Sequence, residues 1–435
     1  MRATGTRAVS TLVMGALALA TLARAADTAP ATSDSDSEMS GLMRGAQGPY
    51  AMTREGSGTS WQPDASVHAG LHALKGEWML MSHARLNGIY DWQQGPRGDS
   101  ETYLSGMFMG VARRALGGGS GGSDGDILQL RAMLSPDALT GKRGLPLLLQ
   151  TGETADGTKP LVDRQHPHEL FMEMSASYSH SLTARSAVYL YGGLPGEPAF
   201  GPPAFMHRMS VMDSPEPPIS HHWLDSTHIV FGVVTAGFVH DCWKLEVSRF
   251  RGREPDQFRF NIETGPLDST AARMSWNPTR TLALQLSWAY VMHPEQLRPD
   301  ENQRKWSAST IYTNEFRGSG WWSTTLAWGR RSAESSWLDA VAIESALTAG
   351  GPWTGFVRGE RVDNDELPTA SGITGMPYTV GKVSVGAIRD FPLAGRVKFG
   401  VGALFALNFV PAALAPAYGG STPKAAMVFV RLKVE

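Results

Sequence analysis

Short segments with alternating apolar and polar residues follow one another from Lys75 to the last residues, and this pattern limits the fold more than any other feature. In one such segment the apolar set is Leu282, Leu284, Leu286, Trp288 and Tyr290. The same alternation occurs in Trp78–Asn87, Trp243–Ser248 and Val428–Glu435. Since successive side chains of a strand point to opposite faces, each segment predicts a strand with one apolar and one polar face.

We therefore expect an all-β fold with about 16 strands, within a range of roughly 12 to 18. Most of the expected strands are near the roughly 9–11 residues that cross a bilayer when a strand is tilted. The predicted strands are 75–90, 100–113, 127–138, 168–180, 186–193, 226–239, 242–251, 268–277, 280–291, 304–315, 320–330, 336–348, 353–362, 377–389, 396–408 and 424–435.

The connections between these strands alternate between long and short. Long ones include 139–167 and 194–225, a short one is 240–241, and only 115–126 and 331–335 break the alternation. Long external loops and short periplasmic turns are typical of a transmembrane antiparallel β-barrel. A soluble β-sandwich is the alternative, but the tryptophans near the predicted strand ends favour the aromatic girdles of a membrane barrel.

The N-terminus has the layout of a cleaved secretory signal peptide. An apolar run at Ala8–Ala23 follows basic residues and ends in the A-x-A site Ala23-Arg24-Ala25. The following polar, Gly/Ser-rich stretch predicts a flexible periplasmic arm that could dock inside the barrel through Tyr50 and Trp61. The expected division is a signal peptide at 1–25, the arm at 26–74 and a barrel at 75–435 in the outer membrane of a Gram-negative bacterium.

Composition agrees with this division and limits the partners. Charged residues are 18% of the chain, below the roughly 25% of soluble domains. Cys242 is the single cysteine, so no intramolecular disulfide can form. A net charge of −2 predicts no nucleic-acid partner. The expected partners are outer-membrane lipid, lipopolysaccharide and small solutes or metal ions, with the protein either a monomer or a homotrimer.

Charged and polar residues on the face opposite the lipid would line the lumen. A barrel of this size is wide enough for an aqueous pore unless something fills it. This predicts a transport or permeability role, although the lumen charges could also simply pair with one another. The predicted lumen residues are Glu77, His83, Arg85, Arg131, Glu173, Lys244, Glu246, Arg273, Lys305, Arg358, Lys382, Lys398 and Arg431.

Histidines gather in two neighbouring long loops. Neutral imidazole suits copper and zinc, so an alternative function is a surface metal-binding protein that uses His-rich external loops to hold one ion at about 2.0–2.1 Å. Packing of these side chains within a folded plug is the competing interpretation. The candidate metal residues, for a copper or zinc ion, are His166, His168, His207, His221, His222, Asp225 and His228.

An outer-membrane hydrolase is a third hypothesis. Ser226, Asp225 and His222 are residue types that could supply a nucleophile, an orienting carboxylate and a base. However, neither a nucleophile elbow nor a second oxyanion element accompanies them. We therefore predict that the protein is not an enzyme.

Several strings in the sequence resemble an uncharacterised family of proteobacterial and acidobacterial exported outer-membrane β-barrel proteins. These strings are Leu147–Gly157, Asp163–Glu169, Gly193–Pro198, Gly201–Arg208, His221–His228, Phe250–Asp256 and Met427–Leu432. The family is grouped with copper- and heavy-metal-resistance systems, so the resemblance implies a link to metal resistance. Its members often have a His/Met-rich segment after the signal peptide, which here is reduced to Met39, Met43 and Met52.

Overall fold

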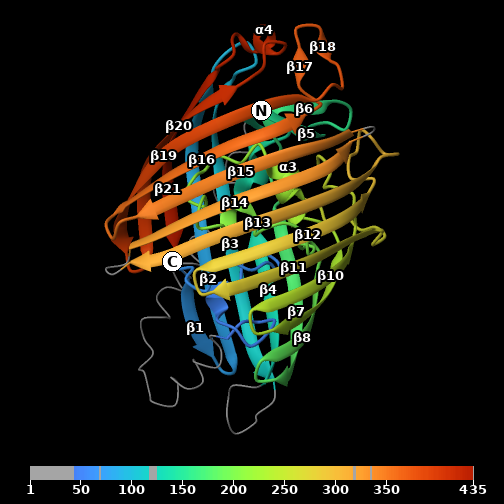
Figure 1. The fold of residues 1–435 in the computed structure, drawn as a ribbon. Coiled ribbons are helices and arrows are strands. Elements are labelled where there is room, and N and C mark those ends of the chain that lie inside the picture. Colours follow the sequence, from blue (N-terminus) through green and yellow to red (C-terminus); the bar gives the residue numbers. More distant parts are fainter. Residues whose placement is uncertain (1–43, 68–69, 117–124, 317–319, 334–335, 435) are drawn as a thin grey trace, which may run out of the picture.

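The computed structural model describes residues 44–67, 70–116, 125–316, 320–333 and 336–434. The signal peptide expected at the N-terminus lies outside the described residues. The described part forms one large antiparallel sheet that closes on itself, with smaller elements in the connections (Figure 1). The fold is therefore the all-β, closed barrel that the alternating segments predict.

The described residues contain 16 barrel strands. They are β2 (Trp78–Gln93), β3 (Ser100–Leu116), β4 (Asp126–Leu134), β7 (Phe171–Thr183), β8 (Ser186–Gly193), β9 (Val233–His240), β10 (Trp243–Phe250), β11 (Ser269–Thr279), β12 (Leu282–Met292), β13 (Asn302–Phe316), β14 (Gly320–Ala333), β15 (Ser336–Thr348), β16 (Trp353–Asn364), β19 (Tyr378–Ala394), β20 (Val397–Phe409) and β21 (Lys424–Val434). Each strand pairs with the next, and β2 pairs with β21 to close the barrel.

Short elements lie outside this ring of strands. They are β1 (Leu71–Lys75), β5 (Leu145–Thr154), β6 (Pro160–Gln165), β17 (Pro368–Thr369), β18 (Gly372–Ile373), α3 (His221–Leu224), α4 (Ala415–Tyr418) and the 3₁₀ turns η1 (Met52–Arg54), η2 (Pro136–Thr140), η3 (Phe205–His207) and η4 (Ser226–His228). Strand β1 forms a hairpin with the first residues of β2, Trp78–Ser82, which β21 does not reach.

Every predicted barrel strand has a counterpart in the structure, with one large error in position. Strands β8 and β15 have the predicted bounds, whereas the strand predicted at 226–239 begins only at Val233. Residues 226–232 instead belong to the connection between β8 and β9, where η4 and a bridge between Gly196 and Val230 hold the backbone. The prediction failed there because the buried apolar run Ile229–Phe231 lies just before the strand and resembles its beginning.

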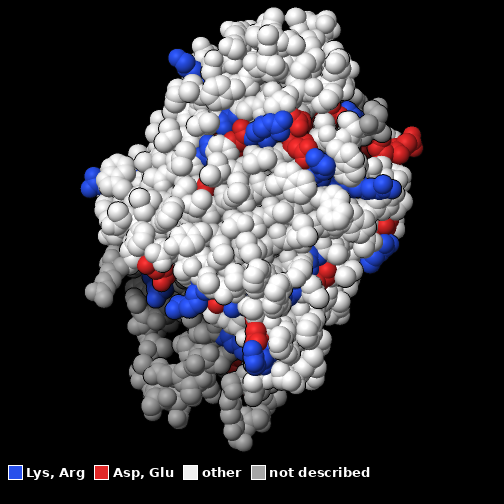
Figure 2. Space-filling model, viewed as in Figure 1, with Lys and Arg blue, Asp and Glu red and all other residues white. Residues whose placement is uncertain are grey.

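The outer face of the barrel is apolar. Leu245 is 54% exposed, Leu286 51% and Leu326 52%. A water-soluble barrel would avoid exposing so many large apolar side chains. On the face seen in Figure 2, charged side chains gather in two rows and a broad band between them has almost none. No described helix has the length and apolar character needed to cross a bilayer.

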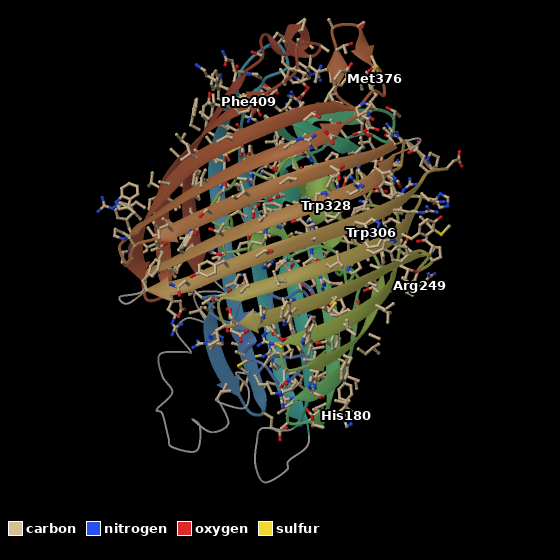
Figure 3. The ribbon with its side chains drawn as sticks, viewed as in Figure 1. His180, Arg249, Trp306, Trp328, Met376 and Phe409 are labelled. Atoms are coloured by element: carbon tan, nitrogen blue, oxygen red, sulfur yellow. The ribbon has the colours of Figure 1, made fainter. Side chains whose placement is uncertain are left out.

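Tryptophans mark both edges of the apolar band. Trp243 and Trp276 stack with ring centroids 4.8 Å apart at the end of the barrel where the turns are short. Trp306 and Trp337 lie at the other end, and Figure 3 shows Trp306 there, far from His180 at the lower end. Aromatic girdles around an apolar band on a closed barrel define a protein of the Gram-negative outer membrane, with the short turns on the periplasmic side.

The interior of the barrel is filled by three segments that lie outside the barrel strands: one N-terminal segment and two connections. We call residues 44–67 the N-terminal plug, residues 194–232 between β8 and β9 the central plug, and residues 135–170 between β4 and β7 the cover loop. Tyr50 and Trp61, which the sequence suggested as docking residues, are 6% and 4% exposed within the N-terminal plug. This part of the expected arm is therefore folded inside the barrel.

The apolar outer face yields a direct test of membrane insertion. Leu286→Arg places a charge near the middle of β12, where the free energy of unfolding from lipid vesicles should fall by about 2–4 kcal/mol. Denaturant titration of the refolded barrel measures this difference. Asp300→Arg, in the exposed connection after β12, should change it by less than about 0.5 kcal/mol. Equal effects of the two substitutions would contradict the assignment of Leu286 to the lipid face.

Candidate metal centre

The charged residues predicted to line the lumen point inward, but most are buried. Their burial shows that they face protein, not an open pore. Exposed fractions are 9% or less for Arg131, Glu173, Lys244, Glu246, Arg273, Lys305, Arg358, Lys382 and Arg431. His83 and Arg85 line a small internal cavity, and Lys398 is half-buried near the periplasmic end of β20. Glu77 differs from the prediction, since it lies in the β1–β2 turn with a side chain that is 72% exposed.

The N-terminal plug is attached to the periplasmic half of the wall. Glu55 of the plug forms an ion pair with Arg113 of β3 at 2.6 Å. Asn277 of β11 donates a hydrogen bond to the carbonyl of Gln62 at 2.8 Å. The ammonium of Lys244 lies 4.8 Å from the centre of the Trp61 ring, a cation–π contact. Polar groups of the wall therefore find their partners in the plug.

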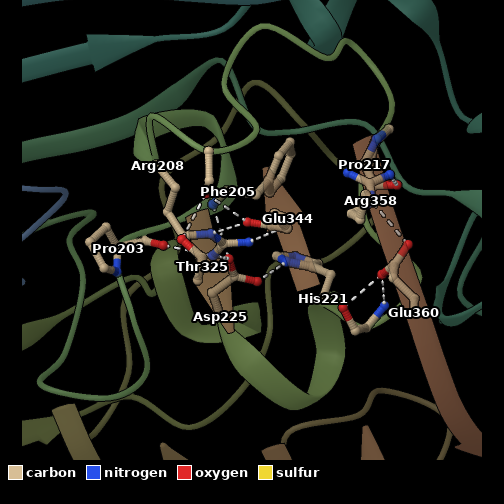
Figure 4. A network of polar contacts seen from close by, with 12 residues as sticks. Pro203, Phe205, Arg208, Pro217, His221, Asp225, Thr325, Glu344, Arg358 and Glu360 are labelled. Carbon is tan, nitrogen blue, oxygen red and sulfur yellow. Dashed lines mark hydrogen bonds and ion pairs between the residues drawn. The ribbon is translucent and has the colours of Figure 1, made fainter. Parts of the chain in front are cut away.

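The central plug is attached to the opposite part of the wall through buried ion pairs (Figure 4). Arg208 binds Glu344 of β15 at 2.8 Å, and both side chains are almost fully buried. Glu216 binds Arg358 of β16 at 2.9 Å and also pairs with Lys382 of β19. Because removing one partner from a buried ion pair costs about 3–5 kcal/mol, these contacts hold the plug in one position.

The cover loop closes the external end. Its β5–β6 hairpin carries Leu147, Leu148 and Leu149, which are each 0% exposed and pack in a cluster with Trp223 of the central plug. Asp163 in β6 accepts a hydrogen bond from Tyr418 of α4 at 2.9 Å and pairs with Arg97. The cover loop and the central plug therefore pack against each other inside the mouth of the barrel.

Histidines meet where these two segments touch. One ligand atom each from His166 of the cover loop and from His221 and His222 of α3 lies within 4.8 Å of the other two. The rings of His168 and His228 adjoin them, with centroids 5.4 Å apart, and the His228 ring lies 4.9 Å from that of His221. We call these five residues the histidine centre.

Oxygen atoms orient three of these imidazoles in the same way. Nδ1 of His221 lies 2.6 Å from Asp225 Oδ1, and Nδ1 of His168 lies 2.7 Å from Asp137 Oδ2. Nδ1 of His228 lies 2.7 Å from the carbonyl oxygen of Asp225. An oxygen acceptor at Nδ1 places the proton there and leaves the lone pair on Nε2, which is the arrangement of metal-bound histidines.

Burial keeps three histidines of the centre, His166, His222 and His228, in the form that binds metal. Burial first, then the charge of Arg259, holds the pKa of His166 well below its ordinary value. Burial, followed by the neighbouring His221, does the same to the pKa of His222. Burial lowers the pKa of His228 to about 3. The imidazoles of His166, His222 and His228 are thus neutral at pH 7, and neutral imidazole is the ligand of transition metals.

The spacing of the three ligand atoms fits one ion after a small movement. Tetrahedral coordination at about 2.0–2.1 Å places nitrogens roughly 3.3–3.4 Å apart. The ligand atoms lie within 4.8 Å of one another, so a rotation of the rings would bring them to this spacing. Gly152 allows the His222 ring its position, because a Cβ on Gly152 would lie 1.9 Å from Cε1 of that ring.

The structure brings together most of the predicted metal residues, but not at the surface. His166 is 8% exposed, His168 4%, His221 1% and His228 6%, so the expectation of a surface site in external loops is wrong. The loops that carry them fold into the barrel instead, because they bury apolar and ion-paired residues there. His207 lies apart from the centre, in the cavity that His83 lines.

Asp225 supports the centre instead of facing the gap between the three imidazoles. Its Oδ1 contacts His221, and its Oδ2 accepts hydrogen bonds from Arg208 at 2.8 Å and from the backbone of Phe205 at 3.0 Å. Both oxygens are thus engaged with the protein. The carboxylate holds a candidate ligand in position and links it to the wall of the barrel.

Sequence reasoning missed the other residues that surround the centre. Glu153 lies 3.1 Å from Nε2 of His166, and Arg259 binds both Glu153 and Glu169 at 2.9 and 2.6 Å. Asp137 reaches His168 from η2. These contacts join distant parts of the cover loop to one another and to the connection between β10 and β11, so no spacing along the chain could reveal them. Glu169, which directly follows His168 in the sequence, was the nearest signal.

The residues of the hydrolase hypothesis lie close together without forming the expected relay. Asp225 contacts His221 instead of His222. Ser226 Oγ accepts a hydrogen bond from the Lys305 ammonium at 3.0 Å.

Comparison with known proteins finds similarity only among solved structures. No protein-family model and no curated protein matches the chain. Salmonella typhi OmpF in complex with daunomycin is 10% identical, with a TM-score of 0.49, over 83% of this chain and 100% of that one. Vibrio cholerae OmpT is 8% identical (TM-score 0.46; 83% and 99% covered). The channel DcaP of Acinetobacter baumannii is also 8% identical (TM-score 0.46; 84% and 100%).

These likenesses concern the porin-like barrel fold, and no residue role is taken from them. The pairing of the strands already shows a closed barrel.

The ion pairs of the central plug generate a prediction about permeability. Glu216→Ala leaves Arg358 and Lys382 buried without their shared carboxylate, at a cost of about 3–5 kcal/mol to the packed plug. We expect larger and noisier ion conductance in planar bilayers than for the wild type. Glu315→Ala, at an exposed position near the end of β13, is the control and should conduct like the wild type. Unchanged conductance of Glu216→Ala would show that these ion pairs do not hold the lumen closed.

Proposed function

We propose that this protein is an outer-membrane transport barrel for transition-metal ions, with the histidine centre as its internal binding site. The observation that carries the proposal is the approach of ligand atoms of His166, His221 and His222 to within 4.8 Å of one another. Histidines that only pack against one another need not direct their ligand atoms toward a common point. Here the rings converge inside a barrel, where a bound ion lies between the external and the periplasmic sides.

The filled interior supports a selective role over general diffusion. Two cavities inside the described part of the barrel have volumes of about 100 and 40 Å³, which are too small to hold ordinary nutrients. Small cations can be passed between protein ligands without an open channel. A barrel that binds its cargo internally therefore agrees with this interior better than a wide pore does.

The ligand chemistry points to copper(II) or zinc(II). Imidazole suits both ions, and copper(II) stands above zinc in the general order of affinities. The resemblance to exported proteins grouped with copper and heavy-metal resistance points the same way, so a role in metal resistance is part of this proposal. A homotrimer and contacts with lipopolysaccharide stay predictions. So does the absence of enzymatic activity, which the contacts of Asp225 and Ser226 favour.

Metal binding by the detergent-solubilised, full-length mature protein tests the site. We expect a single tight site for Cu(II) or Zn(II) in chelator-competition titrations, with affinity reduced at least 100-fold in His166→Gln/His221→Gln/His222→Gln. Glutamine retains most of the side-chain volume, so the fold should survive, which circular dichroism and heat-modified gel mobility check.

The matched control is His180→Gln/His240→Gln. These histidine side chains are 54% and 50% exposed at the periplasmic end and should contribute nothing to the tight site. Equal affinities of the wild type and the triple variant would exclude the histidine centre as a metal site.

Transport is tested separately in proteoliposomes that contain a metal-sensitive dye. Wild-type barrels should admit the ion faster than barrels of the triple histidine variant, while the His180→Gln/His240→Gln control should match the wild type. Tight binding without any flux would restrict the protein to metal binding and contradict the transport role.

A further inference from the structure

Methionines occupy an unexpected place on the inner face of the barrel. In membrane barrels the face turned toward the lumen is usually polar. Here β2 turns Met79 and Met81 inward, and β3 turns Met107 and Met109 inward. Three of these four side chains are at most 6% exposed: Met79 1%, Met81 6% and Met107 5%. Leucine could pack equally well at these positions. The presence of methionines therefore suggests a chemical role for their thioethers.

These methionines line one internal cavity together with methionines from both plugs. The cavity has a volume of about 100 Å³ and lies at the periplasmic ends of β2, β3 and β21. The N-terminal plug contributes Met52, and the central plug contributes Met206 and Met212. Four separate segments of the chain thus bring sulfur atoms or histidines to the same space. We call it the methionine cavity.

Two histidines accompany the thioethers. The rings of His83 and His207 have centroids 6.4 Å apart, and both line the methionine cavity. Nε2 of His207 is buried and has no hydrogen-bond partner among the described residues. A buried nitrogen without a hydrogen-bond partner is unfavourable unless something binds it.

The cationic side chains of the methionine cavity are engaged by other groups. Arg113 binds Glu55 at 2.6 Å, and Arg131 lies 3.6 Å from Glu173. Arg85 donates a hydrogen bond to the carbonyl of Met212 at 2.6 Å. The donors proposed for a ligand in the cavity are its thioethers and Nε2 of His207, which are soft donors for a metal and poor partners for an anion.

The methionine cavity continues toward the histidine centre. A second cavity of about 40 Å³ is lined by His166 and His168 of that centre. It shares four lining residues with the methionine cavity: Arg85, Met107, Met206 and Met212. The two cavities are therefore neighbours, and together they extend from the histidine centre to the periplasmic end of β2.

We propose that the methionine cavity is a second metal site, which takes soft monovalent cations, Cu(I) or Ag(I), through thioether sulfur and His207. The inference deepens the proposed function, on which its place along the transport route rests, but binding itself requires only the cavity. Thioether ligands select Cu(I), whereas imidazole also suits divalent ions. The cavity takes ions that are already monovalent, so no oxidation or reduction occurs at it.

Silver(I) binding to the mature barrel tests this site. The protein carries Cys242→Ala, since the single thiol would bind silver itself. We expect at least a tenfold loss of Ag(I) affinity in Met81→Leu/Met107→Leu/Met206→Leu, while Zn(II) affinity stays unchanged. Exchange of methionine for leucine conserves volume and usually preserves the fold. Met174→Leu/Met274→Leu/Met376→Leu replaces exposed methionines and should bind Ag(I) like the parent.

A second arm separates this inference from the proposed function. In the His166→Gln/His221→Gln/His222→Gln background, Ag(I) should still bind, and X-ray absorption should show sulfur neighbours around the silver. Equal Ag(I) affinity of the inner methionine variant and the parent would overturn the methionine site. Loss of Ag(I) binding in the triple histidine variant alone would also overturn it, because the silver would then occupy the histidine centre.

Discussion

The ion pairs between the barrel wall and the central plug are the interaction on which the rest of the structure depends. A charge buried without a partner is too unfavourable to persist, so each wall charge requires a particular position of the plug. One chain of contacts shows the consequence: Glu344 binds Arg208 at 2.8 Å, Arg208 binds Asp225 at 2.8 Å, and Asp225 holds His221 at 2.6 Å. A barrel strand thereby sets the orientation of a candidate metal ligand.

The same pairs explain why charged lumen residues do not make this barrel an open porin. On the inner face of a wide pore, charges are stabilised by water. Here the wall charges are stabilised by Asp213, Glu216 and backbone groups of the central plug. The central plug also packs against the N-terminal plug, since Ser57 Oγ accepts a hydrogen bond from the backbone N–H of Ala204 at 2.7 Å. Any route through the lumen therefore passes between protein side chains, which favours cargo that binds to them.

The sequence was sufficient to predict the barrel because all of its strands follow the same local pattern. Each strand alternates between lipid and interior, and β8 and β15 have the predicted bounds. The connections follow no such rule. The histidines of two loops could be singled out by their residue type, yet the position of the loops inside the barrel depends on long-range pairs such as Arg208 with Glu344. The contact of Asp137 with His168 and the cavity around Met81 were invisible for the same reason.

Charge balance around the histidine centre favours a cation over a neutral packing role. Three carboxylates touch its imidazoles: Asp137, Glu153 and Asp225. Arg259 and Arg208 pair with two of them, and each of these arginines also pairs with a further carboxylate, Glu169 or Glu344. These five carboxylates outnumber the two arginines and Lys305, whose ammonium donates to the carbonyl oxygen of His222 at 3.4 Å. Imidazoles would hold a divalent ion directly, while the surrounding carboxylates offset its charge in a largely buried interior.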